Sequence, residues 1–151
     1  MSDTSLNPLR VGLLGIGTVG SGVFAVLQRN QEEIMRRAGR GIAIVAVADL
    51  DVERARRLVG PQVQVHADAR RVIADPSIDI VVELIGGYGI ARQLVLEAIA
   101  AGKHVVTANK ALLAVHGTEI FAAAQKKGVM VAFEAAVAGG IPIIKALREG
   151  L

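Results

Sequence analysis

Residues 10–23 read RVGLLGIGTVGSGV, and this stretch decides the fold. Its first five residues are typical of a short buried strand, and the valines from residue 19 onward recur at helical spacing. Gly15, Gly17 and Gly20 lie between the two segments. In such a turn the first glycine permits the tight bend, the second lets the backbone approach a pyrophosphate, and the third lets the helix pack closely on the sheet. The stretch predicts a dinucleotide-binding turn, with a ligand-free glycine turn as the alternative.

Strand-like and helix-like segments alternate along the rest of the chain, about six times in all. The expected strands are residues 10–14, 42–48, 62–66, 78–84, 104–107 and 129–133, and the expected helices are 19–38, 52–59, 90–101, 118–127 and two that start near residues 68 and 142. This alternation predicts an α/β, Rossmann-type doubly wound, mainly parallel sheet with helices on both faces. We expect residues 1–9 to be a flexible leader and residues 10–141 to form the dinucleotide-binding domain.

The composition argues against several other classes of protein. The chain has no cysteine, which excludes a disulfide framework and thiolate metal sites. Its net charge of +3 comes from dispersed basic residues without interleaved aromatic side chains, so we expect no nucleic-acid partner. Glycines interrupt the uncharged run at residues 11–28, and residues 1–9 lack a secretory pattern. We therefore expect no membrane partner and a cytoplasmic protein.

Two candidate cofactor contacts follow other strands. Asp49 closes the strand at 42–48, where an acidic residue binds the adenine ribose in dinucleotide sites, although a turn aspartate is the alternative. Arg54 and Arg56 are near enough to receive a 2′-phosphate, so NAD and NADP both stay open. The segment Ile85-Gly86-Gly87 follows the strand at 78–84, where the nicotinamide ribose usually lies; an ordinary flexible loop is the alternative.

Lys110 is the candidate reactive residue. It lies just beyond the strand at 104–107 and near the start of a helical stretch, where the helix dipole disfavours a cation. Contact with a carbonyl oxygen or a proton relay would explain that position, and a solvated surface lysine is the alternative. Glu83 lies within a buried-strand pattern and therefore requires a partner there.

Four blocks of sequence closely resemble homoserine dehydrogenase. They are GLLGIGTVGSG (12–22), VVELIGG (81–87), TANKALL (107–113) and EAAVAGGIPIIK (134–145), and they occur in the family's order over nearly the whole chain. The first is general to Rossmann proteins, whereas the last two are more specific. The resemblance implies hydride transfer between NAD(P)H and L-aspartate 4-semialdehyde, which gives L-homoserine in threonine and methionine biosynthesis.

The resemblance also assigns site residues. It implies cofactor contacts at Thr18, Val19, Thr107 and Lys110, and it places Lys110 at the reacting centre. The full expected cofactor site is Gly15, Gly17, Thr18, Val19, Gly20, Asp49, Ile85, Gly86, Gly87, Thr107, Asn109 and Lys110. A monovalent cation such as Na⁺ is implied at Glu134, Val137, Gly139 and Ile141, whereas the residues alone favour Glu134 as the cap of the helix at Pro142.

In this family a substrate and dimerisation domain follows, so we expect residues 142–151 to begin a helix that leads into an absent domain. By the same resemblance, the small-molecule substrate and homo-oligomer contacts lie mainly in that region, and the 151-residue chain is not expected to turn over alone. Two other hypotheses stay open. One is another Rossmann dehydrogenase of the aspartate or sugar type, and the other is a non-catalytic NAD(H)-binding sensor.

Overall fold

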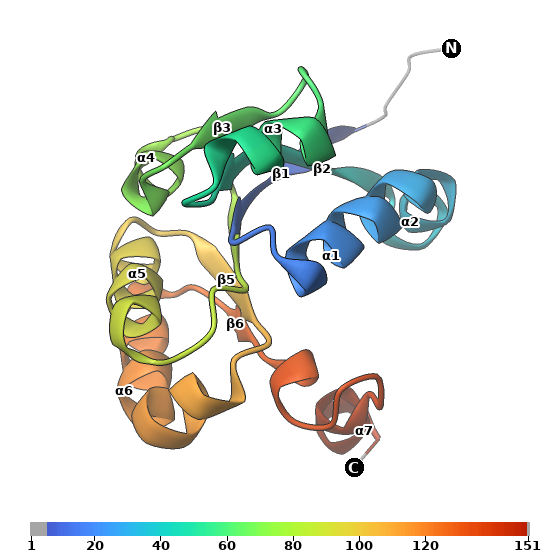
Figure 1. Ribbon diagram of the computed structural model, residues 1–151. Coiled ribbons are helices and arrows are strands. Elements are labelled where there is room, and N and C mark those ends of the chain that lie inside the picture. Colours follow the sequence, from blue (N-terminus) through green and yellow to red (C-terminus); the bar gives the residue numbers. More distant parts are fainter. Residues whose placement is uncertain (1–5, 151) are drawn as a thin grey trace.

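The computed structural model describes residues 6–150, which form one parallel sheet of six strands in the order β3-β2-β1-β4-β5-β6 (Figure 1). The strands are β1 (Leu6–Leu14), β2 (Arg40–Ala48), β3 (Gln64–His66), β4 (Ile80–Glu83), β5 (His104–Thr107) and β6 (Val131–Ala132). Every neighbouring pair is parallel. This strand order is that of the doubly wound Rossmann fold, which confirms the predicted fold class.

Helices cover both faces of the sheet. They are α1 (Thr18–Arg29), α2 (Gln31–Ala38), α3 (Val52–Val59), α4 (Ala69–Ala74), α5 (Gly89–Ala100), α6 (Lys110–Lys127) and α7 (Ile143–Glu149), with a 3₁₀ turn η1 (Glu134–Ala136) before α7. One core packs Val11, Leu13 and Val47 against α1 and α3. The other packs Leu14 and Val81 against α4, α5 and α6. No helix within residues 6–150 is long and apolar enough to cross a membrane.

The structure corrects three expected boundaries. Strand β1 begins at Leu6, so residues 6–9 belong to the sheet rather than to a leader; residues 1–5 lie outside the described part. The expected single helix at 19–38 is divided at Asn30, because the Gln31 side chain donates hydrogen bonds to the carbonyl oxygens of Leu27 and Ile42. Helix α6 begins at Lys110 rather than at residue 118, because Asn109 caps its first turn.

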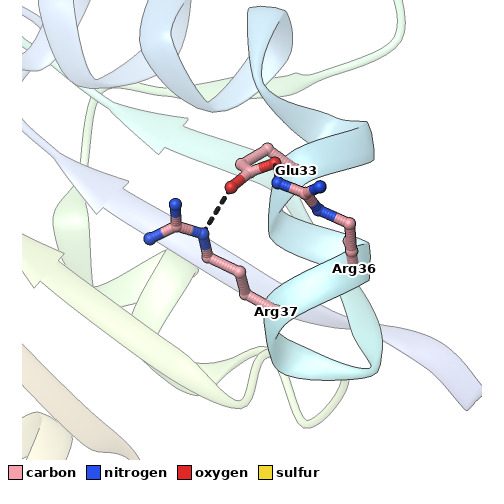
Figure 2. A network of polar contacts seen from close by, with 3 residues as sticks. All are labelled: Glu33, Arg36 and Arg37. Atoms are coloured by element: carbon pink, nitrogen blue, oxygen red, sulfur yellow. Dashed lines mark hydrogen bonds and ion pairs between the residues drawn. The ribbon is translucent and has the colours of Figure 1, made fainter.

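Exposed ion pairs neutralise part of the basic surface. Figure 2 shows Glu33 with Arg36 and Arg37, all from α2, and both guanidinium groups pair with its carboxylate. Nearby, Arg40 donates two hydrogen bonds to the carbonyl oxygen of Asn7. Such exposed pairs contribute little stability, about 0–1 kcal/mol each. Their consequence is that the arginines clustered at residues 36–40 already have partners within the chain.

A buried lysine holds the amino end of the sheet, opposite to the carboxyl ends of the strands. Lys103 is 6% exposed, and its Nζ donates to the carbonyl oxygens of Asp75 at 2.6 Å and Ile78 at 2.8 Å. Burial lowers the pKa of this lysine. Lys103 therefore fixes the turn between α4 and β4 to the start of β5.

We expect Lys103→Met to lower the free energy of unfolding by about 2–4 kcal/mol, because methionine keeps the buried chain but leaves two carbonyl groups without a donor. Urea denaturation of the 151-residue chain measures this change. Lys126→Met, at an exposed lysine in the last turn of α6, is the matched control and should change stability by less than about 0.5 kcal/mol. Equal stabilities of the two variants would contradict a structural role for Lys103.

Candidate dinucleotide site

The loops after β1 and β4 lie side by side at the carboxyl edge of the sheet. These two strands are neighbours, and the connections that follow them lead to helices on opposite faces. The Gly15 amide donates to the carbonyl oxygen of Ala48 at 2.8 Å, and the Leu84 amide donates to that of Leu14 at 2.9 Å. The two loops therefore flank the topological switch point, where open α/β sheets bind their ligands.

The three glycines of the turn have different surroundings. Gly15 has a φ of +90°, and a Cβ at Gly20 would lie 2.2 Å from the Gly15 carbonyl oxygen, so the fold itself requires both. Gly17 is exposed, and a Cβ there would meet no atom of the protein within 4 Å. Packing therefore gives no reason for a glycine at this position, whereas close approach of a ligand does.

The start of α1 is open. Gly17 is its N-cap, no side chain caps the helix, and its first turn holds no acidic residue. Thr18 and Val19 are exposed beside it. The free N–H groups of such a helix end and its partial positive charge suit a phosphate.

Asp49 lies directly after β2, and its carboxylate contacts the glycine turn. Oδ2 accepts a hydrogen bond from the Ile16 amide at 2.8 Å, and Oδ1 accepts one from the Asp51 amide at 2.9 Å. Asp49 is therefore a turn aspartate that fixes the glycine turn to β2, as the alternative interpretation of this residue expected. Its ribose contact stays a prediction, and its position beside the turn is the one that role requires.

A cavity of about 360 Å³ lies next to Asp49. Its walls are largely apolar, with Leu50, Ile85 and Ile90 from the loops after β2 and β4 and from α5. Asp68, which precedes α4, also lines it. The sequence pattern identified Asp49 and Ile85 but not the other lining residues, among them Leu50 and Asp68 in loops at the same edge of the sheet and Leu94 within α5.

The loops after β4 and β5 are joined by hydrogen bonds. The buried Glu83 carboxylate accepts from the Thr107 hydroxyl at 2.7 Å and from the Ile85 amide at 2.8 Å. The Asn109 side chain accepts from the Leu112 amide and donates to the carbonyl oxygen of Gly87. Thr107 is the partner that the sequence left unnamed for Glu83, and Asn109 is the cap that begins α6.

Lys110 is the first residue of α6, directly after the buried Asn109 cap. Its side chain is exposed at the carboxyl edge of the sheet, and it forms no ion pair with any residue that the structure describes. Hydrogen bonds thus place Thr107 and Asn109 beside the 85–87 loop, and Lys110 directly follows Asn109 in the chain. The structure also leaves the Lys110 ammonium free to meet a ligand.

Glu134 caps α7. Its Oε1 accepts from the Ile144 amide at 2.9 Å, and its Oε2 accepts from the Lys145 amide at 3.1 Å. Val137, Gly139 and Ile141 lie in the loop between η1 and α7, where Gly139 has a φ of +62°. Within residues 6–150 no group of three or more His, Cys, Asp or Glu side chains could hold a metal ion. The capping role expected from the residues alone is therefore present, and the cation site stays a prediction.

The strand order, the switch-point loops and the open glycine turn define a dinucleotide-binding domain of the Rossmann class. A family model described as "Homoserine dehydrogenase, NAD binding domain" matches residues 15–134. The chain therefore belongs to the family of homoserine dehydrogenase NAD-binding domains, and its cofactor class is NAD(P).

Individual relatives agree with this assignment. The homoserine dehydrogenase of Pseudomonas aeruginosa is 60% identical over 97% of this chain and 33% of its own length. That of Neisseria gonorrhoeae is 58% identical over 97% of this chain and 33% of its own length. The crystal structure of a homoserine dehydrogenase from Thiobacillus denitrificans has a TM-score of 0.90 and 64% identity, covering 95% of this chain and 33% of that one. The chain thus spans about a third of the length of these relatives.

Proposed function

We propose that the chain is the cofactor-binding part of an NAD(P)-dependent oxidoreductase that interconverts L-aspartate 4-semialdehyde and L-homoserine. The observation that carries the proposal is the turn at the switch point, where Gly17 is open without any packing reason in a member of this family. The substrate and the reaction come from the names of the relatives, of which this chain covers about a third.

The proposed cofactor position follows the carboxyl edge of the sheet. The pyrophosphate lies at Gly17 and the first turn of α1, whose amide groups suit it. The adenine lies in the 360 Å³ cavity beside Asp49, because apolar walls suit a flat ring and the carboxylate suits a ribose hydroxyl. Ile85 lines the adenine cavity, and the nicotinamide end lies farther along this loop, between Gly86, Gly87 and Lys110.

Lys110 is the proposed catalytic residue. When bound, NAD(P)H would supply the hydride for the aldehyde carbon, so that negative charge would develop on the aldehyde oxygen. The Lys110 ammonium, at the positive end of α6, stabilises that charge electrostatically and donates a hydrogen bond to the oxygen. Transfer of a proton from the Lys110 ammonium to that oxygen would complete the alcohol, and the lysine would regain a proton from solvent.

Three further features belong to the proposal. A monovalent cation such as Na⁺ binds at Glu134, Val137, Gly139 and Ile141, through loop carbonyl oxygens and the carboxylate lone pairs that the α7 amides leave open. The enzyme is a homo-oligomer, and exposed apolar side chains near α7, Ile141 at 65% and Leu147 at 53%, support further contacts at this end. The enzyme acts in the cytoplasm.

The test of the proposed function is turnover by the complete enzyme in which this domain is joined to the substrate region. We expect that enzyme to oxidise NADH or NADPH when L-aspartate 4-semialdehyde is added, and the 151-residue chain, assayed in parallel, to bind cofactor without turnover. A complete enzyme that binds the dinucleotide but leaves the semialdehyde unchanged would contradict the reaction and favour another dehydrogenase or a non-catalytic sensor.

A further inference from the structure

Glu83, the last residue of β4, is a buried carboxylate without a cationic partner. The residue is 0% exposed, and no Lys, Arg or His among residues 6–150 forms an ion pair with it. A buried charge is unfavourable unless hydrogen-bond donors replace its water. The amides of Ile85 and Gly86 and the Thr107 hydroxyl serve as these donors to its carboxylate oxygens.

Two of these donors belong to the loop after β4. The amides of Ile85 and Gly86 donate to Glu83 Oε1 at 2.8 and 3.3 Å. Gly86 and Gly87 have φ values of +85° and +64°, which is the left-handed region that favours glycine. The carboxylate thus fixes a loop whose glycines would otherwise leave it conformationally free.

The third donor joins Glu83 to the loop that carries Lys110. The Thr107 hydroxyl donates to Glu83 Oε2 and accepts from the Asn109 amide at 3.0 Å. The Asn109 side chain then donates back to the carbonyl oxygen of Gly87. Two routes therefore connect the 85–87 loop to the residue before Lys110, one through Glu83 and Thr107 and one through Asn109, and together they close a ring.

We propose that Glu83 is a positioning residue, which sets the Lys110 ammonium relative to the loop at the nicotinamide end of the cofactor. The proposal rests on the proposed function, because it needs Lys110 to act on the substrate. Glu83 has no exposed surface and does not touch the substrate. It acts by holding both loops with one carboxylate, at a site where a displacement of about 1 Å is enough to slow a reaction about 100-fold.

Substitutions at Glu83 and at Thr107 test the two sides of this hydrogen-bonded ring. Glu83→Gln keeps the size of the side chain, and its carbonyl oxygen can still accept from the loop amides, but its NH₂ group faces Thr107 as a donor. The Thr107 hydroxyl hydrogen then loses its acceptor. Thr107→Val keeps the shape of Thr107 and removes the hydroxyl, whereas Thr107→Ser retains it.

The experiment measures kcat with L-aspartate 4-semialdehyde, the Kd for NADPH and the Tm of the complete enzyme. Glu83→Gln should lower kcat by about 10- to 100-fold and change the Kd by less than about threefold. The effect on kcat should disappear when Glu83→Gln is combined with Lys110→Ala, because Glu83 acts through Lys110. Thr107→Val should lower kcat in the same way and lose that effect in the Lys110→Ala background, and Thr107→Ser should restore most of kcat. Lys103→Met, at the opposite end of the sheet, is the control that loses Tm without losing kcat.

An equal loss of kcat in the Lys110→Ala background would overturn the proposal. It would also be overturned if Lys103→Met lost as much kcat as Glu83→Gln at the same loss of Tm, because loss of stability alone would then explain the effect. If Glu83→Gln does not fold, the Thr107→Val and Thr107→Ser pair decides by the same criteria. A wild-type enzyme without turnover would instead overturn the proposed function, and the role of Glu83 with it. If the wild type turned over but the kcat losses of Glu83→Gln and Lys110→Ala added in the double variant, the role of Glu83 alone would be overturned.

Discussion

Lys110→Ala lowers the kcat of the complete enzyme by about 100- to 1,000-fold, while the Kd for NADPH changes less than about threefold. Loss of one preorganised donor to a developing oxyanion has an effect of this order. The cofactor keeps its contacts because Asn109, rather than Lys110, caps α6 and joins it to the 85–87 loop. Steady-state turnover and equilibrium binding on the same preparation measure the two quantities.

The control for this prediction is Lys126→Ala, since Lys126 is an exposed lysine in the last turn of the same helix. Lys126→Ala removes an equal charge, but Lys126 lies at the other end of α6, away from the carboxyl edge of the sheet. The kcat of this variant should therefore equal that of the wild type. If Lys110→Ala also kept the wild-type kcat, Lys110 would be a solvated surface residue and its catalytic role would have to be abandoned.

Gly17→Val has the second large effect, which falls on binding rather than on stability. A Cβ at residue 17 would meet no atom of the protein within 4 Å, but a side chain there occupies the surface that a pyrophosphate must approach. Loss of one charge-assisted hydrogen bond amounts to about 1.5–3 kcal/mol, or about 10- to 150-fold in Kd for NADH. The Tm of the variant should stay within a few degrees of the wild type, because residue 17 has an ordinary φ of −66°.

Gly20→Ala gives the opposite result and serves as the counterpart. Its added Cβ would lie 2.2 Å from the Gly15 carbonyl oxygen, so α1 must move away from the turn. Overpacking against rigid backbone lowers stability by about 1–3 kcal/mol or more. Thermal denaturation and cofactor titration of both variants separate the two roles. Loss of Tm in Gly17→Val with unchanged binding would contradict the assignment of Gly17 to the ligand.

The fold could be predicted from the sequence because buried parallel strands are continuous apolar runs bounded by glycine and polar residues. The expected element boundaries were wrong where tertiary contacts override the local sequence pattern. Asn7 and Pro8, which are unfavourable in strands, interrupt the apolar pattern at the start of β1, yet this segment pairs with β2 through Leu6 and Leu9. The expected helix began at residue 118, yet α6 already includes Gly117, which is buried within it near Phe121.

The candidate site was predictable only as a set of loops. Parallel strands bring their carboxyl ends to one edge, so Asp49, the 85–87 loop and Lys110 could be placed there from sequence. Which groups bond to one another could not be predicted, because Glu83 and Thr107 lie on separate strands and register decides their contact. The cavity beside Asp49 could not be predicted either, because its walls come from separate loops, and Asp68 belongs to the loop after β3.

The central claim is that this chain binds a nicotinamide dinucleotide at the turn after β1. Calorimetric titration of the 151-residue chain with NADH and with NADPH, alongside the Gly17→Val variant, tests it most directly. We predict saturable binding of one dinucleotide per chain, weakened at least about tenfold in the variant. The account would be contradicted if neither dinucleotide bound at millimolar concentration, or if the wild type and the variant bound equally well.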